Sequence, residues 1–387
     1  MTVDPITPNH LSELRERIQE LAGSRLSAFV NETETTGIIP SAALVAMSET
    51  GCFGRALPAD FGGTGEGLRA FCIQQEELAR VWPTAAVAAT WTNLSGILLT
   101  KFGTPAQQAE LLAAIATGRS MGAVAWTEPH GGSDAASLRT TAVRVEGGWL
   151  LSGSKRLIDN AAKADFIIVG ARSDLDGPPR RAMSMFVVRR DNPGFHFGGT
   201  YETLGLKGAG VGHFTLQNCF IPDADVFGDI GRGFYQMMAM VEFGRTGVAA
   251  MCVGIAQRAL DSAVEFLTER VSFGRKLSDN DVILAAIADM RIKLDGARML
   301  TERAAIMFDA GERCTAEAAI AKVFASEVAI DTTACALHLH GGIGFTSEVP
   351  IERFFRDCQA FTIGEGTSEV LRMVIGRHEF ARSRSTK

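Results

Sequence analysis

The stretch "VILAAIADMRIKLDGARMLTERAAIMFDAG", residues 282–311, decides the fold class of the C-terminal half of this chain. Its apolar residues recur at spacings of three and four, which is the period of a helix with one buried face. The pattern runs for about eight helical turns and ends at Gly311, a residue type that commonly terminates helices. A helix of this length must bury its apolar face against other long helices, so the stretch predicts a helical bundle.

The sequence on either side of this stretch extends the same pattern. "GIAQRALDSAVEFLTER" (254–270) and "EAAIAKVFASEVAIDTTACALHLHGG" (317–342) repeat the helical period, and the second breaks off at Gly341. Upstream, short apolar runs such as "DFIIVGAR" and "AMSMFVVRR" alternate with Gly, Asn, Asp and Pro, which is typical of a small antiparallel barrel or sandwich. Residues 11–120 return to a helical pattern, as in "FCIQQEELARVW". We therefore predict an α+β fold with a helical domain (1–120), a central β domain (121–228) and a C-terminal helical domain (229–387).

Composition narrows the functional classes. With 387 residues, 46% hydrophobic and 21% charged, the chain has the make-up of a globular protein of more than one domain. A net charge of −6 argues against nucleic acid or an anionic membrane as the main partner. The seven cysteines form no CxxC pair, and no zinc site or disulfide framework is expected. No apolar run reaches the length of a membrane span and the N-terminal residues lack the pattern of a secretion signal, so we expect a cytoplasmic enzyme.

Three glycine-containing loops have alternative interpretations. "AWTEPHGGSDAAS" (125–137) could present backbone N–H groups and the hydroxyls of Thr127 and Ser133 to a polar ligand, or could only join two domains. In "ERVSFGRK" (269–276), Arg270 could bind phosphate, or could simply be favoured by the dipole at a helix C-terminus. "HLHGGIGF" (338–345) lacks acidic and Cys partners at metal-ligand spacing, so a tight turn is preferred to a metal site.

The stretch "TIGEGTSEV" (362–370) places one carboxylate, Glu365, between two glycines. Thr367 or Ser368 can cap the helix that follows, with Glu369 in its first turn. A surface turn is the ordinary interpretation. The apolar sequences on both sides instead favour a turn that is held against a core, where desolvation raises the pKa of the carboxylate and makes it a better base. A lone carboxylate base suits removal of a proton from carbon, with a cofactor completing the oxidation.

Taken together, these motifs resemble the acyl-CoA dehydrogenase family of flavoproteins over nearly the whole chain. "TEPHGGSD" is similar to the flavin-side signature of that family, and "HGGIGFTSEVPIERFFRD" followed by "GEGTSEV" is similar to its C-terminal signature. The resemblance implies an N-terminal helical domain, a central antiparallel β-barrel-like domain, a C-terminal four-helix bundle and a homotetramer or homodimer. It also implies FAD as cofactor, with Glu365 as the base that removes the α-proton of an acyl thioester while hydride leaves for flavin N5. Some members carry the base at the position of Gly244 instead.

The resemblance also assigns binding residues position by position. It implies FAD contacts from Trp126, Thr127, Gly132, Ser133, Leu157, Asp159, Arg270, Ser272, Phe273, Asp281, His338, Gly341, Gly342, Thr367 and Glu369. Those from Arg270 to Phe273 would reach the FAD of a neighbouring subunit. Substrate contacts are implied for Ser133, Glu242, Arg245 and Gly366, and no metal is implied.

Several positions depart from the family pattern. Leu157 stands where tryptophan is usual, and Asp159 stands where a hydroxyl usually bonds flavin N5. We expect that either Asp159 shifts the redox potential or its side chain turns away. His338 and Asp281 replace glutamines, and Gly364 replaces a common tyrosine.

The resemblance leaves the partners and the alternatives open. The thioester carrier is CoA or an acyl carrier protein, and the electron acceptor is an electron-transferring flavoprotein or oxygen. A flavin monooxygenase on the same fold is the alternative that Leu157 and Asp159 favour and Glu365 opposes. A non-catalytic, DNA-associated relative is disfavoured by the acidic charge and the short C-terminal segment.

Overall fold

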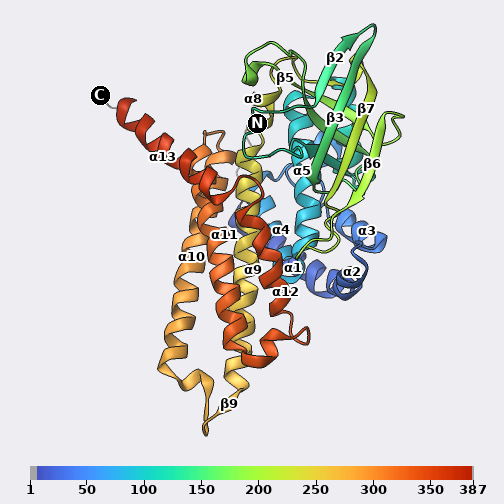
Figure 1. Cartoon of the computed structure of the whole chain (residues 1–387). Helices are drawn as coiled ribbons and strands as arrows, with labels where there is room; N and C mark the ends of the chain where they lie inside the picture. The colour runs from blue at the N-terminus through green and yellow to red at the C-terminus, as the bar shows by residue number, and fades with distance from the viewer. Residues whose placement is uncertain (1–6, 386–387) are drawn as a thin grey trace.

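The computed structural model describes residues 7–385, and three layers follow one another along the chain (Figure 1). Helices of the N-terminal region lie beside the long C-terminal helices, and the twisted sheet sits at one end of both. This is the order of helix, sheet and helix expected from the sequence, and the helical N and C regions with a central sheet are confirmed.

The N-terminal region is built mainly on α4 and α5. Its elements are α1 (Pro8–Glu20), η1 (Leu21–Leu26), η2 (Ser27–Phe29), α2 (Val30–Thr36), α3 (Ser41–Glu49), η3 (Ala59–Phe61), α4 (Gly67–Val81), α5 (Pro83–Phe102), α6 (Pro105–Gln107), η4 (Gln108–Leu112) and α7 (Ala113–Ala116). Pro83 stands in the first turn of α5, where its missing N–H costs no helical hydrogen bond. α5 is buried along almost its whole length because α4, the sheet and α9 all pack around it. It therefore carries side chains to the boundary between the layers.

The central region is one eight-stranded sheet. Its elements are β1 (Gly122–Ala125), β2 (Thr141–Val145), β3 (Gly148–Ile158), β4 (Phe166–Arg172), η5 (Pro179–Arg181), β5 (Met183–Arg189), β6 (Phe195–Thr200), β7 (Gly212–Pro222), η6 (Asp223–Asp225) and β8 (Val226–Phe227). The order is β6-β7-β3-β2-β4-β5-β8, with β1 also on β4. Most pairs are antiparallel, as expected, but β1 and β2 lie parallel to β4. The β2–β3 hairpin separates β1 from β4 in sequence, so the chain can return to the same end of the sheet before it enters β4.

The C-terminal region is dominated by α9, α10 and α11. Its elements are α8 (Gly233–Met238), α9 (Val241–Glu269), β9 (Val271–Ser272), β10 (Arg275–Lys276), η7 (Leu277–Asp279), α10 (Asp281–Asp309), α11 (Thr315–Leu339), η8 (Gly341–Phe345), α12 (Ile351–Cys358), η9 (Gln359–Thr362) and α13 (Ser368–Ser385). α10 ends two residues before Gly311, which has a left-handed φ of 74°. The stretch Gly233–Glu269 is apolar and long enough to cross a membrane, but 83% of its most apolar window is buried inside the fold. Burial in the helical core accounts for that apolar character.

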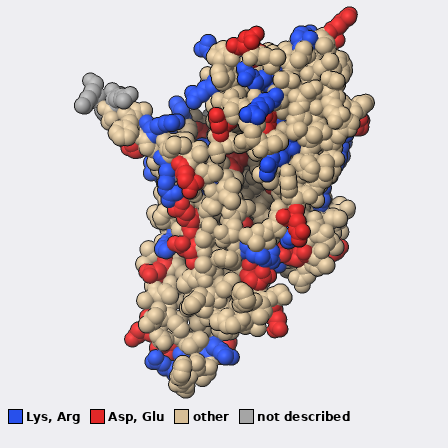
Figure 2. Space-filling view, in the orientation of Figure 1, with Lys and Arg blue, Asp and Glu red and all other residues tan. Residues whose placement is uncertain are grey.

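Acidic and basic side chains are interspersed over the surface. Figure 2 shows no broad area of one sign on the face it presents, in keeping with the modest net charge of −6. The same view shows a hollow at the boundary between the β region and the helices. Residues of all three regions line a cavity in the structure.

Candidate active site

A cavity of about 480 Å³ lies where the sheet, α5, α9 and the start of α13 meet. Glu365 lines it together with Trp91 from α5, Asp159 from the end of β3 and Arg245 from α9. The loop after β1 contributes Trp126, Thr127, Gly132 and Ser133, and Leu157 and Gly366 also reach it. Residues more than 270 positions apart in the sequence therefore share one site.

Glu365 sits on a turn that is fixed by two buried cations. Its φ of 55° is left-handed, and Gly366 follows with a φ of 93°. Arg245 Nε donates a hydrogen bond to the Glu365 carbonyl at 3.3 Å, and Lys322 Nζ donates one to the Gly366 carbonyl at 2.7 Å. Thr367 Oγ1 accepts the N–H of Val370 and so caps α13, as expected. A non-glycine residue at positive φ is costly, and these contacts hold it in place.

The carboxylate of Glu365 is buried, and two positively charged side chains lie near it. Burial raises the pKa of Glu365 above its ordinary value, while the charges of Arg245 and Lys322 act in the opposite direction. Gly244 on α9 faces it directly, because a Cβ at that position would lie 2.9 Å from Glu365 Oε2. A side chain at residue 244 would therefore occupy the same space as the Glu365 carboxylate. Glycine at this position leaves room for the carboxylate.

Asp159 is a second carboxyl group on the same cavity. It follows Ile158 at the end of β3, between Leu157 (φ 55°) and Asn160 (φ 58°). Its pKa is raised to about 7, first by burial and then by the negative charge of Glu365, with Trp91 acting as a hydrogen-bond donor to it. The sequence left open where this side chain points. In the structure it faces Trp91 and Glu365 across the cavity.

The loop that follows β1 is held by a buried ion pair. Glu128 accepts hydrogen bonds from Lys155 Nζ at 2.8 Å and from the N–H groups of Arg139 and Thr140. Burial opposes its charge, yet Lys155 and these donors keep the pKa of Glu128 below its usual value. The Trp126 indole N–H donates to the Ala135 carbonyl at 2.8 Å. These contacts hold the loop in one conformation, and the loop forms one wall of the cavity.

A second group of the predicted FAD residues lies at the far end of the helical bundle. β9 and η8 are both at that end, opposite α13 (Figure 1). Phe273 there has a φ of 51° and a fully exposed side chain. The members of this group are all outside the Glu365 cavity: Arg270, Ser272, Phe273, Asp281, His338, Gly341 and Gly342.

Three further predicted residues lie off the cavity lining. Thr367 caps α13 and Glu369 is in its first turn, and neither residue lines the cavity. Glu242 lines a separate cavity with Lys101, and its carboxylate accepts from the Thr315 hydroxyl and from Cys314 Sγ at 3.7 Å. Its partners in the structure are thus protein groups.

Sequence reasoning missed Lys322 and Trp91. A lysine within the apolar run "EAAIAKVFASEV" was a visible signal, because a fully buried lysine needs a partner. Trp91 carries no such signal, since a tryptophan in a core helix is ordinary.

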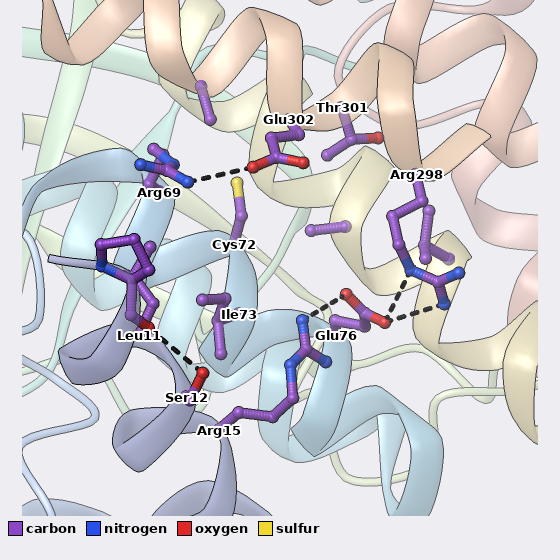
Figure 3. Close-up of a pocket in the computed structure, with 14 residues that line it drawn as sticks. Leu11, Ser12, Arg15, Arg69, Cys72, Ile73, Glu76, Arg298, Thr301 and Glu302 are labelled. Carbon is purple, nitrogen blue, oxygen red and sulfur yellow. Dashed lines mark hydrogen bonds and ion pairs between the residues drawn. The ribbon is translucent and has the colours of Figure 1, made fainter. Parts of the chain in front are cut away.

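A different cavity, between α1, α4, α9 and α10, differs from this one in its charges (Figure 3). Arg15 and Arg298 both pair with Glu76, at 3.3 and 3.0 Å, and Arg69 pairs with Glu302 at 3.0 Å. Its charged groups satisfy one another. In the cavity at Glu365, in contrast, the carboxyl groups of Asp159 and Glu365 take part in no ion pair among residues 7–385.

The residues of the Glu365 cavity fit a flavin. Leu157 is 49% exposed and lines the cavity with Gly132, so a flat ring system has an apolar wall and a glycine of the loop beside it. Thr127 and Ser133 add hydroxyl groups. These are the groups by which a protein positions a cofactor.

Comparison with known proteins identifies the family of this chain. Models of the N-terminal, middle and C-terminal domains of acyl-CoA dehydrogenase match residues 8–119, 123–219 and 231–380. An acyl-CoA dehydrogenase of Bacillus subtilis is 34% identical over 366 residues, which cover 94% of this chain and 96% of that protein. The caffeyl-CoA reductase-Etf complex subunit CarC of Acetobacterium woodii is 36% identical, with the same coverage.

Solved structures of acyl-CoA dehydrogenases have the same fold as this chain. Butyryl-CoA dehydrogenase from Megasphaera elsdenii superimposes with a TM-score of 0.94 at 31% identity, over 97% of this chain and all of that one. The FAD complex of PigA, at 24% identity and a TM-score of 0.93, shares the fold. This chain belongs to the acyl-CoA dehydrogenase family, whose members are FAD-dependent oxidoreductases acting on CH–CH bonds.

Proposed function

We propose that this protein catalyses α,β-dehydrogenation of an acyl thioester, with Glu365 as the base that removes the α-proton. The observation that carries the proposal is a desolvated carboxylate, held on a fixed turn in a cavity that fits a flavin. A carboxylate with a raised pKa is a stronger base toward a carbon acid. FAD, when bound, supplies the hydride acceptor.

The turn that carries Glu365 also offers a hydrogen-bond donor to the carbonyl oxygen of the thioester. Among residues 7–385, the backbone N–H of Glu365 donates no hydrogen bond. A free N–H next to the base is suited to the carbonyl oxygen, on which negative charge develops as the α-proton leaves. Gly364 leaves this side open, because a Cβ there would contact only the Ala360 carbonyl at 3.5 Å. One turn thus presents both the base and a donor for the enolate oxygen.

The carrier arm of the substrate would meet two arginines. Arg180 and Arg377 line the same cavity as Glu365. Arginine binds phosphate oxygens in a bidentate way, and both CoA and the prosthetic arm of an acyl carrier protein contain phosphate. The names of two relatives include an electron-transferring flavoprotein, and we infer a protein of that kind as the electron acceptor. The compartment of this reaction would be the cytoplasm.

We further infer that the working enzyme is a homotetramer or a homodimer. The two groups of FAD residues lie at opposite ends of the bundle, so one chain alone cannot bring them to one cofactor. A second copy would carry Arg270, Ser272 and Phe273 to the FAD of the first. The exposed ring of Phe273 is explained if a second copy covers it. Phe273→Ala should lower FAD retention and the oligomer mass, as measured by absorbance and light scattering.

The proposed reaction is tested by anaerobic mixing of the FAD-loaded protein with butyryl-CoA. Oxidised flavin absorbance should fall in the wild type and should stay unchanged in Glu365→Gln, with FAD still bound. Glu16→Gln, which changes an exposed acid on α1, should behave as the wild type. Bleaching by Glu365→Gln at the wild-type rate would remove Glu365 from the mechanism. Oxygen addition to a substrate without anaerobic bleaching would favour the monooxygenase.

A further inference from the structure

A second large cavity lies between α2 and the loop of residues 201–211, which joins β6 to β7. Its volume is about 570 Å³, compared with about 480 Å³ for the cavity at Glu365, and the two cavities share no lining residue. In Figure 1, α2 lies next to the end of the sheet that carries β6. Two lysines line the cavity, Lys163 from the turn before β4 and Lys207 from the loop. This α2–loop cavity is therefore distinct from the cavity that fits a flavin.

Lys163 is a half-buried cation with no acidic partner. Its Nζ donates a hydrogen bond to the Ile39 carbonyl at 2.8 Å, which holds the ammonium group in place. No ion pair involves Lys163 among residues 7–385, and burial alone lowers its pKa to about 8, so the side chain is mostly charged at pH 7. An ammonium group has three protons to donate, and only one is used within the described part of the chain. A bound anion would supply the charge and the acceptors that these residues do not.

The acidic residues at this cavity do not neutralise its lysines. Glu34, on α2, pairs with Arg356 of α12 at 3.0 Å. The carboxylate of Glu202 lies 4.0 Å from Lys207 Nζ, but its side chain is 96% exposed, and a pair so open to solvent contributes little. Because one acid is engaged by an arginine and the other extends into solvent, the α2–loop cavity is left with a positive charge.

The backbone of the loop adds unused donors to the two lysines. Leu206, Gly208 and Gly210 have left-handed φ values of 53°, 86° and 66°. Left-handed residues that alternate with ordinary ones can turn several N–H groups toward one side, and such concave backbone segments bind anions. Among residues 7–385, the N–H groups of Lys207, Gly208 and Gly210 donate no hydrogen bond. Gly208 is buried, and a buried N–H without an acceptor is unfavourable unless a water molecule or a ligand accepts from it.

We propose that the α2–loop cavity binds the phosphate group of a small phosphorylated metabolite, with Lys163 and Lys207 as its cations. A phosphate carries up to two negative charges, which two lysines match, and the free N–H groups of the loop are donors for its remaining oxygens. The cavity is larger than a phosphate ion, and small-molecule sites commonly have volumes of this size. Tyr201 also lines it, and the Tyr201 hydroxyl, which makes no hydrogen bond among residues 7–385, can bond the rest of the ligand. The proposal does not depend on the reaction at Glu365.

The test measures binding of AMP, glycerol 3-phosphate and inorganic phosphate to the FAD-loaded protein by calorimetry at low ionic strength, since salt screens such contacts. Adenosine and glycerol are the matched ligands without phosphate. At least one phosphate compound should bind at concentrations up to about 10 mM, and adenosine and glycerol should not. Tighter binding of an ester than of inorganic phosphate would show that the rest of the molecule occupies the cavity, whereas equal binding would identify a site for the free anion.

Three variants locate the site. Lys163→Met keeps the length of the side chain and removes its charge, so it should weaken phosphate binding by about tenfold or more. Lys293→Met is the matched control, because it removes an exposed lysine of α10, and it should bind as the wild type does. Arg180→Gln removes an arginine of the Glu365 cavity and should keep the binding that Lys163→Met weakens.

Bleaching of the flavin by butyryl-CoA serves as a separate check that Lys163→Met is folded and loaded with FAD, and its rate should equal that of the wild type. No binding of any phosphate compound, or equal binding by Lys163→Met and the wild type, would overturn the proposal. Loss of binding in Arg180→Gln alone would place the phosphate in the Glu365 cavity and would overturn it too. Absence of bleaching in the wild type would count against the proposed dehydrogenation and leave the phosphate site standing.

Discussion

Replacement of Gly244 by alanine tests whether the placement of the Glu365 carboxylate controls the rate. In the structure a Cβ at residue 244 lies 2.9 Å from Oε2 and 3.1 Å from Cδ of Glu365. Ordinary contacts begin at 3.4 Å, so the carboxylate must move by roughly half an ångström. The backbone of its turn is held by Arg245 and Lys322, and the side chain therefore has to absorb the movement.

The expected effect is on chemistry, with little effect on stability. A misplacement of about 1 Å can cost on the order of 100-fold in rate, so half of that predicts a loss of about tenfold in the rate of flavin bleaching. Alanine is the better helix former by about 1 kcal/mol, which offsets the strain in α9. Unfolding should stay near the wild-type denaturant midpoint.

The matched control is Gly247→Ala, one turn further along the same helix. A Cβ at residue 247 would also lie 2.9 Å from a neighbour, but that neighbour is Cε1 of Phe71. Single-turnover bleaching under anaerobic conditions should be slowed more in Gly244→Ala than in Gly247→Ala. Equal rates for Gly244→Ala and the wild type, with FAD fully bound, would refute the argument that this glycine makes room for the base.

Three other predictions follow from buried charges. Lys322→Met removes a cation that lowers the pKa of Glu365, so the pH at which bleaching reaches half its maximum should rise. Glu128→Gln leaves Lys155 buried without its anion and should destabilise the protein by about 3 kcal/mol in urea unfolding, with loss of FAD. The pKa of Asp357 is raised from 3.8 to about 7, so its contribution to stability is complete at low pH and is lost as pH rises toward 7. Asp357→Asn should therefore flatten the fall in melting temperature between pH 4 and pH 7; an unchanged slope would contradict the assignment.

The sequence was sufficient for the architecture because the signals involved are local. Helical periodicity with terminal glycines located the long helices, since a helix that buries one face must repeat its apolar residues at that period. Short apolar runs between turn residues located the sheet for the same reason. The pairing of strands was less accessible, because parallel contacts of β1 and β2 with β4 depend on residues far apart in the chain.

The carboxylate at Glu365 could be singled out from sequence because its flanking glycines and apolar neighbours are themselves unusual. The residues that surround Glu365 could not be predicted from the sequence. The cations that fix its turn come from α9 and α11, and the direction of Asp159 depends on contacts with α5. Charge, burial and free space around a group are sums over residues that only folding brings together. The sequence by itself determined the elements and a carboxylate of interest, and the tertiary structure decided which groups face that carboxylate.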